Sequence, residues 1–228
     1  MNKIEKYRNL VHKRKQCFLC QCLHNPASID KGKWDSDQIG PWSLWQASLD
    51  AELIIVGQDW GDVSYFKKWE GRDQPSGNPT NENLQKLLGT IGIDVRKPRE
   101  VQHQIVFFTN IILCLKTGGL QSPVEEQWFQ NCSVAFFKPL VEIIKPIAVL
   151  ALGKKVSESI FEIYGIQQPK NTPLSDKIKQ APYQLTDSTV LFPLYHCGAG
   201  GVNRNRSMEK QMDDWSHIKK FLNNNGFR

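Results

Sequence analysis

The feature that most restricts how this chain can fold is a set of four short apolar runs. They span residues 53–57, 104–114, 146–153 and 189–196. A short and nearly continuous apolar run is typical of a strand buried on both faces, as in a parallel sheet. The segments between the runs have apolar residues at helical spacing. Strands that alternate with helices predict an α/β three-layer sandwich with a mainly parallel, four-stranded central sheet.

Helices are expected at about residues 80–91, 124–144, 154–164 and 207–223. Thr80 is a candidate N-cap of the first helix, and Pro139 is expected to kink or split the second. Three further segments are rich in Gly, Pro or polar residues and are predicted to be irregular or loops, namely 23–50, 62–79 and 165–188.

Length and composition favour one domain over residues 1–228, with residues 1–50 as an N-terminal extension that carries cysteines. The chain has 228 residues and 40% hydrophobic content, enough for one sizeable core. No run reaches the roughly 18 apolar residues of a membrane helix. No apolar stretch follows the basic N-terminus, as a secretory signal would require. We therefore expect a cytoplasmic monomer without a membrane partner, whose cysteines are reduced or metal-bound.

Polar side chains occur at or near the ends of three predicted strands. Asp59 follows the first run, Asn110 interrupts the second, and His196 ends the fourth. In an open α/β sheet, ligands bind beyond the carboxyl ends of the strands, so these groups are expected to meet in one pocket. Each has a plainer alternative: Asp59 could cap a turn, Asn110 could hold a loop, and His196 could be a hydrogen-bonded buried histidine.

Four cysteines have spacings that suit a metal centre. Cys17 and Cys20 form a C-x-x-C pair, and 17 residues separate Cys114 from Cys132. Four thiolates can hold a 4Fe–4S cluster or Zn²⁺, and the spacing does not distinguish the two. Ordinary reduced, buried cysteines are the third possibility. Two cysteines lie outside this set, Cys22 and Cys197, and the first of them is an alternative to Cys20.

Basic residues give mild support for a polyanionic partner. The formal net charge is +6, and six Lys or Arg residues fall within residues 1–15. That segment is either a solvated helix face or a phosphate-contacting face. Arg204 and Arg206 follow the last apolar run and have the same two interpretations.

The order of these motifs resembles that of the uracil-DNA glycosylase superfamily, and most closely its iron–sulfur clade. The resemblance covers most of the chain, from Cys17 to about Arg206. Its motifs are V-G-Q-D-W-G-D at 56–62, T-N at 109–110 with the cysteines at 114 and 132, P-x-x-x-x-x-L-G at 146–153, and F-P-x-x-H at 192–196. The first stands where the family has G-Q-D-P-Y or G-E-x-P-G.

The resemblance implies a DNA repair glycosylase that hydrolyses the N-glycosidic bond of uracil or a related deaminated base. It implies that Asp59 stabilises the sugar cation and orients water, and that neutral His196 donates a hydrogen bond to the departing base. It also implies substrate-binding and phosphate-binding groups: Gly57, Gln58, Trp60, Phe66 and Asn110 for the base, and Arg204 and Arg206 for phosphates. The partner would be DNA with uracil or another damaged base, and the four cysteines would hold a 4Fe–4S cluster.

The chain also departs from the family pattern. Gln58-Asp59 is typical of the cluster-free branch, whereas the cysteines are typical of the iron–sulfur clade. Gly61 stands where the classical branch has a tyrosine that excludes the thymine methyl group, and Ser76 stands near the usual stacking aromatic. The alternative hypothesis is therefore a non-catalytic or differently specific nucleic-acid-binding protein of the same fold, with a cluster or Zn²⁺ as a structural clamp.

Overall fold

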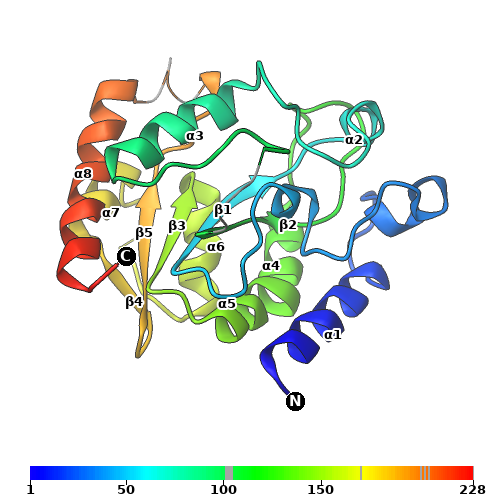
Figure 1. Ribbon diagram of the computed structural model, residues 1–228, viewed down its shortest axis with the longest axis horizontal. Coiled ribbons are helices and arrows are strands. Elements are labelled where there is room, and N and C mark those ends of the chain that lie inside the picture. Colours follow the sequence, from blue (N-terminus) through cyan, green and yellow to red (C-terminus); the bar gives the residue numbers. More distant parts are fainter. Residues whose placement is uncertain (101–104, 170, 201, 203, 205, 228) are drawn as a thin grey trace.

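The protein folds around one five-stranded sheet flanked by helices (Figure 1). The computed structural model describes all residues except 101–104, 170, 201, 203, 205 and 228. The order of strands is β2-β1-β3-β5-β4. Their bounds are β1 Leu53–Asp59, β2 Val106–Ile112, β3 Ala148–Leu152, β4 Tyr183–Thr186 and β5 Thr189–Leu194. The first three and β5 run parallel, and β4 is antiparallel to β5.

The predicted α/β class and its mainly parallel sheet are confirmed, but the predicted number of four strands is wrong. The additional strand, β4, lies at the sheet edge and forms a hairpin with β5. It has only four residues, none of them fully buried, so it lacks the apolar run that marks the other strands. The predicted loop at 165–188 also contains a short helix, α7 (Leu174–Gln180).

Two layers of helices cover the two faces of the sheet. Alternate residues of a strand face opposite sides, so Ile54 and Val56 join one core and Leu53 and Ile55 join the other. The first face is covered by α1 (Lys3–Lys15), α4 (Glu126–Cys132), α5 (Lys138–Ile144) and α6 (Lys154–Ile163). The second is covered by α2 (Val63–Lys68), α3 (Pro79–Thr90) and α8 (Met208–Asn224). The result is the three-layer sandwich (Figure 1).

The helix predicted at 124–144 runs without a gap from Glu126 to Ile144, but its middle is π-helical. Between α4 and α5 lies a π-helical segment, η3 (Ser133–Phe137). Pro139 lies in the first turn of α5, directly after this segment. Cys132 is the last residue of α4.

Two local details of residues 62–81 differ from the prediction. The N-cap of α3 is Asn78 rather than Thr80, because the Asn78 side chain accepts a hydrogen bond from the backbone N–H of Thr80 at 3.0 Å and Pro79 occupies the first helical position. The predicted loop at 62–79 contains α2, whose N-cap, Asp62, accepts from the backbone N–H of Tyr65 at 2.7 Å. Asp62 is therefore a structural residue.

Residues 1–50 pack on the sheet beside β2. Within this region are α1 and two 3₁₀ segments, η1 (Pro26–Gly32) and η2 (Pro41–Leu44). Trp45 stacks on Phe108 of β2 with ring centroids 4.4 Å apart. The basic helix α1 is not wholly solvated, because Arg14 is buried and pairs with Asp35 at 2.6 Å. No helix in the described part of the chain is long and apolar enough to cross a membrane.

Candidate functional site

A cleft of about 720 Å³ lies at the carboxyl ends of the parallel strands. Parallel strands end at the same edge of a sheet, so residues far apart in the sequence meet there. Of the predicted site residues, those that line the cleft are Gly57, Gln58, Asp59, Trp60, Asn110 and His196. The first four end β1 or follow it, Asn110 is in β2, and His196 follows β5.

Asp59 is held by two neighbours. One carboxylate oxygen lies 3.2 Å from the Nζ atom of Lys116, with 7% of the Asp59 side chain and 3% of the Lys116 side chain exposed. The other accepts a hydrogen bond from the Gln58 amide at 2.7 Å. Lys116 also donates to the carbonyl oxygen of Leu120 at 2.9 Å. The sequence analysis did not identify Lys116. The indication that the sequence offered was the position of this lysine just after a buried strand.

His196 has a defined tautomer. Its Nδ1 atom accepts a hydrogen bond from the backbone N–H of Gly198 at 3.0 Å, so in the neutral ring the proton is on Nε2. The side chain is exposed to the open cleft, yet the protein atoms packed around the ring lower the pKa of His196. The charge of Asp59 opposes this shift to a lesser extent. Neutral His196 therefore presents an N–H donor.

The loop that carries His196 is anchored to α3. The Asn83 side chain donates to the backbone carbonyl of Cys197 at 2.8 Å, and the Cys197 thiol donates to the carbonyl of Thr80 at 3.5 Å. Gly198 leaves no room for a side chain, because a Cβ atom there would lie 2.7 Å from Cε1 of His196. The glycine therefore fixes the position of the imidazole.

Asn110 is buried, with 5% of the residue exposed, and its amide makes no hydrogen bond with any described residue. It faces Gly57 on the neighbouring strand, and a Cβ atom at Gly57 would lie 2.7 Å from the Asn110 Oδ1 atom. The same Cβ would lie 3.1 Å from the ring of Trp42, which also lines the cleft. Trp42 was not predicted as a site residue, because it lies in the irregular segment 23–50.

Of the two aromatic residues predicted to bind the base, Trp60 lines the cleft and Phe66 does not. Phe66 is 1% exposed and lies in the core beneath Trp60, with ring centroids 5.9 Å apart, so it does not reach the cleft. Tyr65, the preceding residue on the same short helix, does line the cleft. Its ring centroid lies 4.9 Å from that of Trp60. The orientation of α2 decides which ring is available to a ligand.

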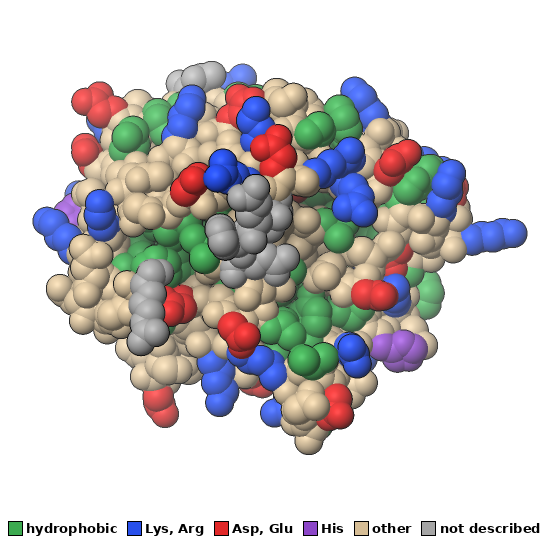
Figure 2. Space-filling view, in the orientation of Figure 1, with side chains coloured by type: hydrophobic (Ala, Val, Ile, Leu, Met, Phe, Trp, Pro, Cys, Tyr) green, Lys and Arg blue, Asp and Glu red, His purple; other side chains and the backbone are tan. Residues whose placement is uncertain are grey.

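The two arginines predicted to contact phosphates do not line the cleft. Arg206 makes a bidentate pair with Asp214 at 2.6 and 2.7 Å, which raises its pKa, whereas Arg204 is exposed. Lys154 and Lys155, at the start of α6, do line it. On the face shown in Figure 2, basic side chains are interspersed with acidic ones.

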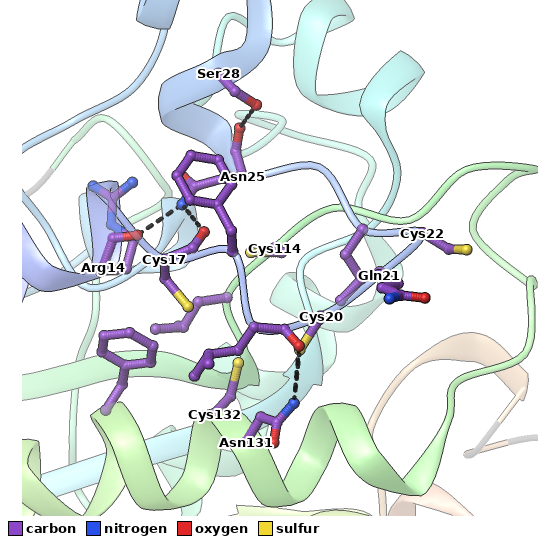
Figure 3. A pocket seen from close by; sticks show the side chains of 15 residues that line it. Arg14, Cys17, Cys20, Gln21, Cys22, Asn25, Ser28, Cys114, Asn131 and Cys132 are labelled. Carbon is purple, nitrogen blue, oxygen red and sulfur yellow. Dashed lines mark hydrogen bonds between the residues drawn. The ribbon is translucent and has the colours of Figure 1, made fainter.

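The four predicted metal ligands lie around a second cavity, of about 330 Å³. Cys17 and Cys20 come from the loop after α1, Cys114 follows β2, and Cys132 ends α4. Their sulfur atoms face the same space, whereas the sulfur of Cys22 points away from it (Figure 3). Folding therefore brings the pair Cys17 and Cys20 together with the pair Cys114 and Cys132, which lies far from it in the sequence.

The thiols of this cavity influence one another. A hydrogen bond between Cys20 and Cys132 lowers the pKa of Cys20 to about 6 and raises that of Cys132. Asn131 also donates to the Cys20 sulfur at 3.5 Å. Burial, together with the charges of Cys17 and Cys20, raises the pKa of Cys114 to about 12. All six cysteines of the chain are free thiols.

Four thiols around one cavity are a ligand set for a 4Fe–4S cluster or for Zn²⁺. Among the described residues, no group of three or more His, Cys, Asp or Glu side chains is placed to hold one metal ion. A zinc ion requires all its sulfur ligands at about 2.3 Å from one point. In a 4Fe–4S cluster, each cysteine binds a different iron atom. The four cysteines fit such a cluster in number and in their common cavity.

No family model matches the chain, and no curated protein has significant sequence similarity to it. The relation to uracil-DNA glycosylases stays a prediction carried by the motifs.

Proposed function

We propose that this protein hydrolyses the N-glycosidic bond of uracil, or a related deaminated base, in DNA. The observation that carries the proposal is the meeting of Asp59, Asn110 and His196 around one cleft at the strand ends. A carboxylate, an amide with no hydrogen-bond partner among the described residues and a neutral imidazole are the groups that such a reaction needs. The cleft is large enough to take a base that has left the helical stack.

The proposed roles follow from the chemistry of bond cleavage. Negative charge develops on the departing base, and the Nε2–H group of His196 is a donor for it. One such donor is worth about 3 kcal/mol of transition-state stabilisation in other enzymes. The Asn110 amide has a donor and an acceptor, which match the N–H and C=O groups of a uracil edge. Asp59 would stabilise the positive charge on the sugar and orient the attacking water, and Lys116 would hold Asp59 in position.

We further propose that Cys17, Cys20, Cys114 and Cys132 bind a 4Fe–4S cluster with a structural role. These ligands join the N-terminal extension to the end of β2 and to α4. A cluster bound by them would tie together segments that are distant in the sequence. A brown preparation with stoichiometric iron supports this assignment, whereas a colourless one with stoichiometric zinc rejects it.

The partner we propose is DNA, bound by a monomer in the cytoplasm. Support comes from the net charge of +6 and from Lys154 and Lys155 at the margin of the cleft.

The decisive assay is release of free base from single- and double-stranded oligonucleotides that contain uracil, hypoxanthine or xanthine. We expect abasic sites with at least one of these, and a large loss of rate in both Asp59→Asn and His196→Ala. If the cluster-loaded protein produces no abasic sites from any of them, the glycosylase proposal is wrong. If either variant retains full activity, the role assigned to that residue is wrong.

One observation favours a second candidate, a nucleic-acid-binding protein of the same fold without catalysis. The ion pair with Lys116 and the hydrogen bond from Gln58 occupy both oxygens of Asp59. A carboxylate held in this way is less free to assist an attacking water. Binding of a uracil-containing oligonucleotide with no base release would favour this candidate.

A further inference from the structure

A side-chain amide donates a hydrogen bond to one of the four predicted ligand sulfurs. The Nδ2 atom of Asn131 lies 3.5 Å from the sulfur of Cys20 and 3.4 Å from the backbone carbonyl oxygen of Leu19 (Figure 3). Asn131 lies in α4, directly before Cys132, whereas Cys20 belongs to the loop after α1. The amide therefore connects two of the segments that supply ligands to the cysteine cavity.

The direction of this hydrogen bond is set by a chain of side-chain amides on α4 that ends at Glu162 of α6. The carboxylate of Glu162 accepts a hydrogen bond from Nε2 of Gln130 at 3.3 Å. Oε1 of Gln130 and Oδ1 of Asn131 both accept from Nε2 of Gln127, at 3.4 and 2.8 Å. An ionised carboxylate only accepts, so every amide in the chain has its NH₂ group fixed in this sense. The NH₂ group of Asn131, and not its oxygen, therefore faces the sulfur of Cys20.

The cysteine cavity lies close to the protein surface at this corner. Phe18 and Leu19 stand between Cys17 and Cys20 in the sequence and line the cavity, and they are 79% and 61% exposed. Cys20 itself is half-buried. Hydrogen bonds to the sulfurs and solvent exposure are among the factors that set the reduction potential of an iron–sulfur cluster. The group that contacts Cys20 is therefore in a position to influence that potential.

An N–H group that donates to a ligand sulfur stabilises negative charge on the cluster. Reduction adds one electron, so the donor stabilises the reduced form more than the oxidised form and raises the reduction potential. We propose that Asn131 is a positioning residue that holds the Cys20 ligand and raises the reduction potential of the 4Fe–4S cluster. This inference rests on the proposed cluster and is independent of the glycosylase activity.

The test is the reduction potential of the cluster-loaded, full-length protein, measured by voltammetry of protein adsorbed on an electrode. One electron passes from the electrode to the cluster, so no chemical reductant is needed. Asn131→Leu removes the donor at similar size, and Asn131→Asp replaces it with an acceptor of the same shape. At a fixed electrode potential, the ratio of reduced to oxidised cluster should fall about tenfold in Asn131→Leu, which corresponds to about 59 mV for one electron. It should fall further in Asn131→Asp, because a carboxylate adds negative charge beside the sulfur.

The matched control is Gln21→Leu. Gln21 is another exposed amide that lines the cavity, but it makes no hydrogen bond with the described cysteines (Figure 3). Its replacement should change the ratio of reduced to oxidised cluster by less than about twofold. Iron content and urea titration show whether each variant is loaded and folded. If Asn131 had only a structural role, its variants would change these two readouts and leave the potential unchanged.

The possible failures are distinguishable. An iron-loaded protein whose potential is the same in the wild type and in both Asn131 variants would overturn the inference and leave the cluster assignment standing. A higher potential in either variant would also overturn it. A colourless protein with stoichiometric zinc would refute the cluster and the inference together. None of these measurements involves DNA, so base release tests the glycosylase proposal separately.

Discussion

The buried carboxyl of Asp73 should make the stability of this protein fall as the pH rises. Burial is the largest influence on this group and raises its pKa from 3.8 to about 7, against the smaller effects of Asn81, Trp60 and the charge of Arg99. Tyr65 also interacts with Asp73, and the pKa of Tyr65 is raised by burial and by the charge of Asp73. Near neutral pH, the folded protein therefore binds a proton that the unfolded chain has lost.

The sign and size of the effect follow from linkage. Between pH 4 and pH 7 the folded state holds more protons than the unfolded state, so the free energy of unfolding decreases with rising pH over that window. Above pH 7 the full cost of the buried charge is present. Raising the pKa of a carboxyl group from 3.8 to about 7 corresponds to about 4 kcal/mol. The variant Asp73→Asn cannot ionise and should lack this contribution.

The assay is urea denaturation of the wild-type protein and of Asp73→Asn at intervals from pH 4 to pH 9. The difference in free energy of unfolding between the two proteins should change by about 4 kcal/mol in favour of the variant, most of it between pH 4 and pH 7. A constant offset from the altered hydrogen bonds does not affect this change. A difference that stays flat across the range would show that Asp73 is not a buried group with a raised pKa, and the reasoning would fail.

Three further predictions concern the rest of the structure. Lys116→Met should cost about 3–5 kcal/mol of stability in a urea titration, because it leaves the buried carboxylate of Asp59 without its cationic partner; a loss below 1 kcal/mol would contradict the ion pair. If the proposed function holds, Gly198→Ala should slow base release at least tenfold, because the new methyl group displaces the ring of His196, whereas Gly200→Ala, with nothing within 4 Å of its Cβ, should not. Cys114→Ser should lose iron and colour on purification, whereas Cys22→Ser should keep both.

The sequence by itself determined the framework of this fold. A continuous apolar run such as 53–57 keeps all its side chains from water only when both faces of the strand are buried. Four strands and their parallel arrangement were therefore predictable. The strand β4 and the helices α2 and α7 were not, because they are four to seven residues long and only partly buried. For elements of this length, hairpin pairing and capping decide the structure, and the local apolar pattern is too short to reveal either.

The sequence also placed Asp59, Asn110 and His196 at one edge, because parallel strands end together. Tertiary structure alone decided what surrounds them. The partner of Asp59 is a lysine more than fifty residues away, and the choice between Tyr65 and Phe66 as the ring in the cleft depends on how α2 packs. The groups around Asp73 likewise come from three separate segments. Contacts of this kind depend on the relative placement of packed elements, which the hydrophobic pattern of each element does not encode.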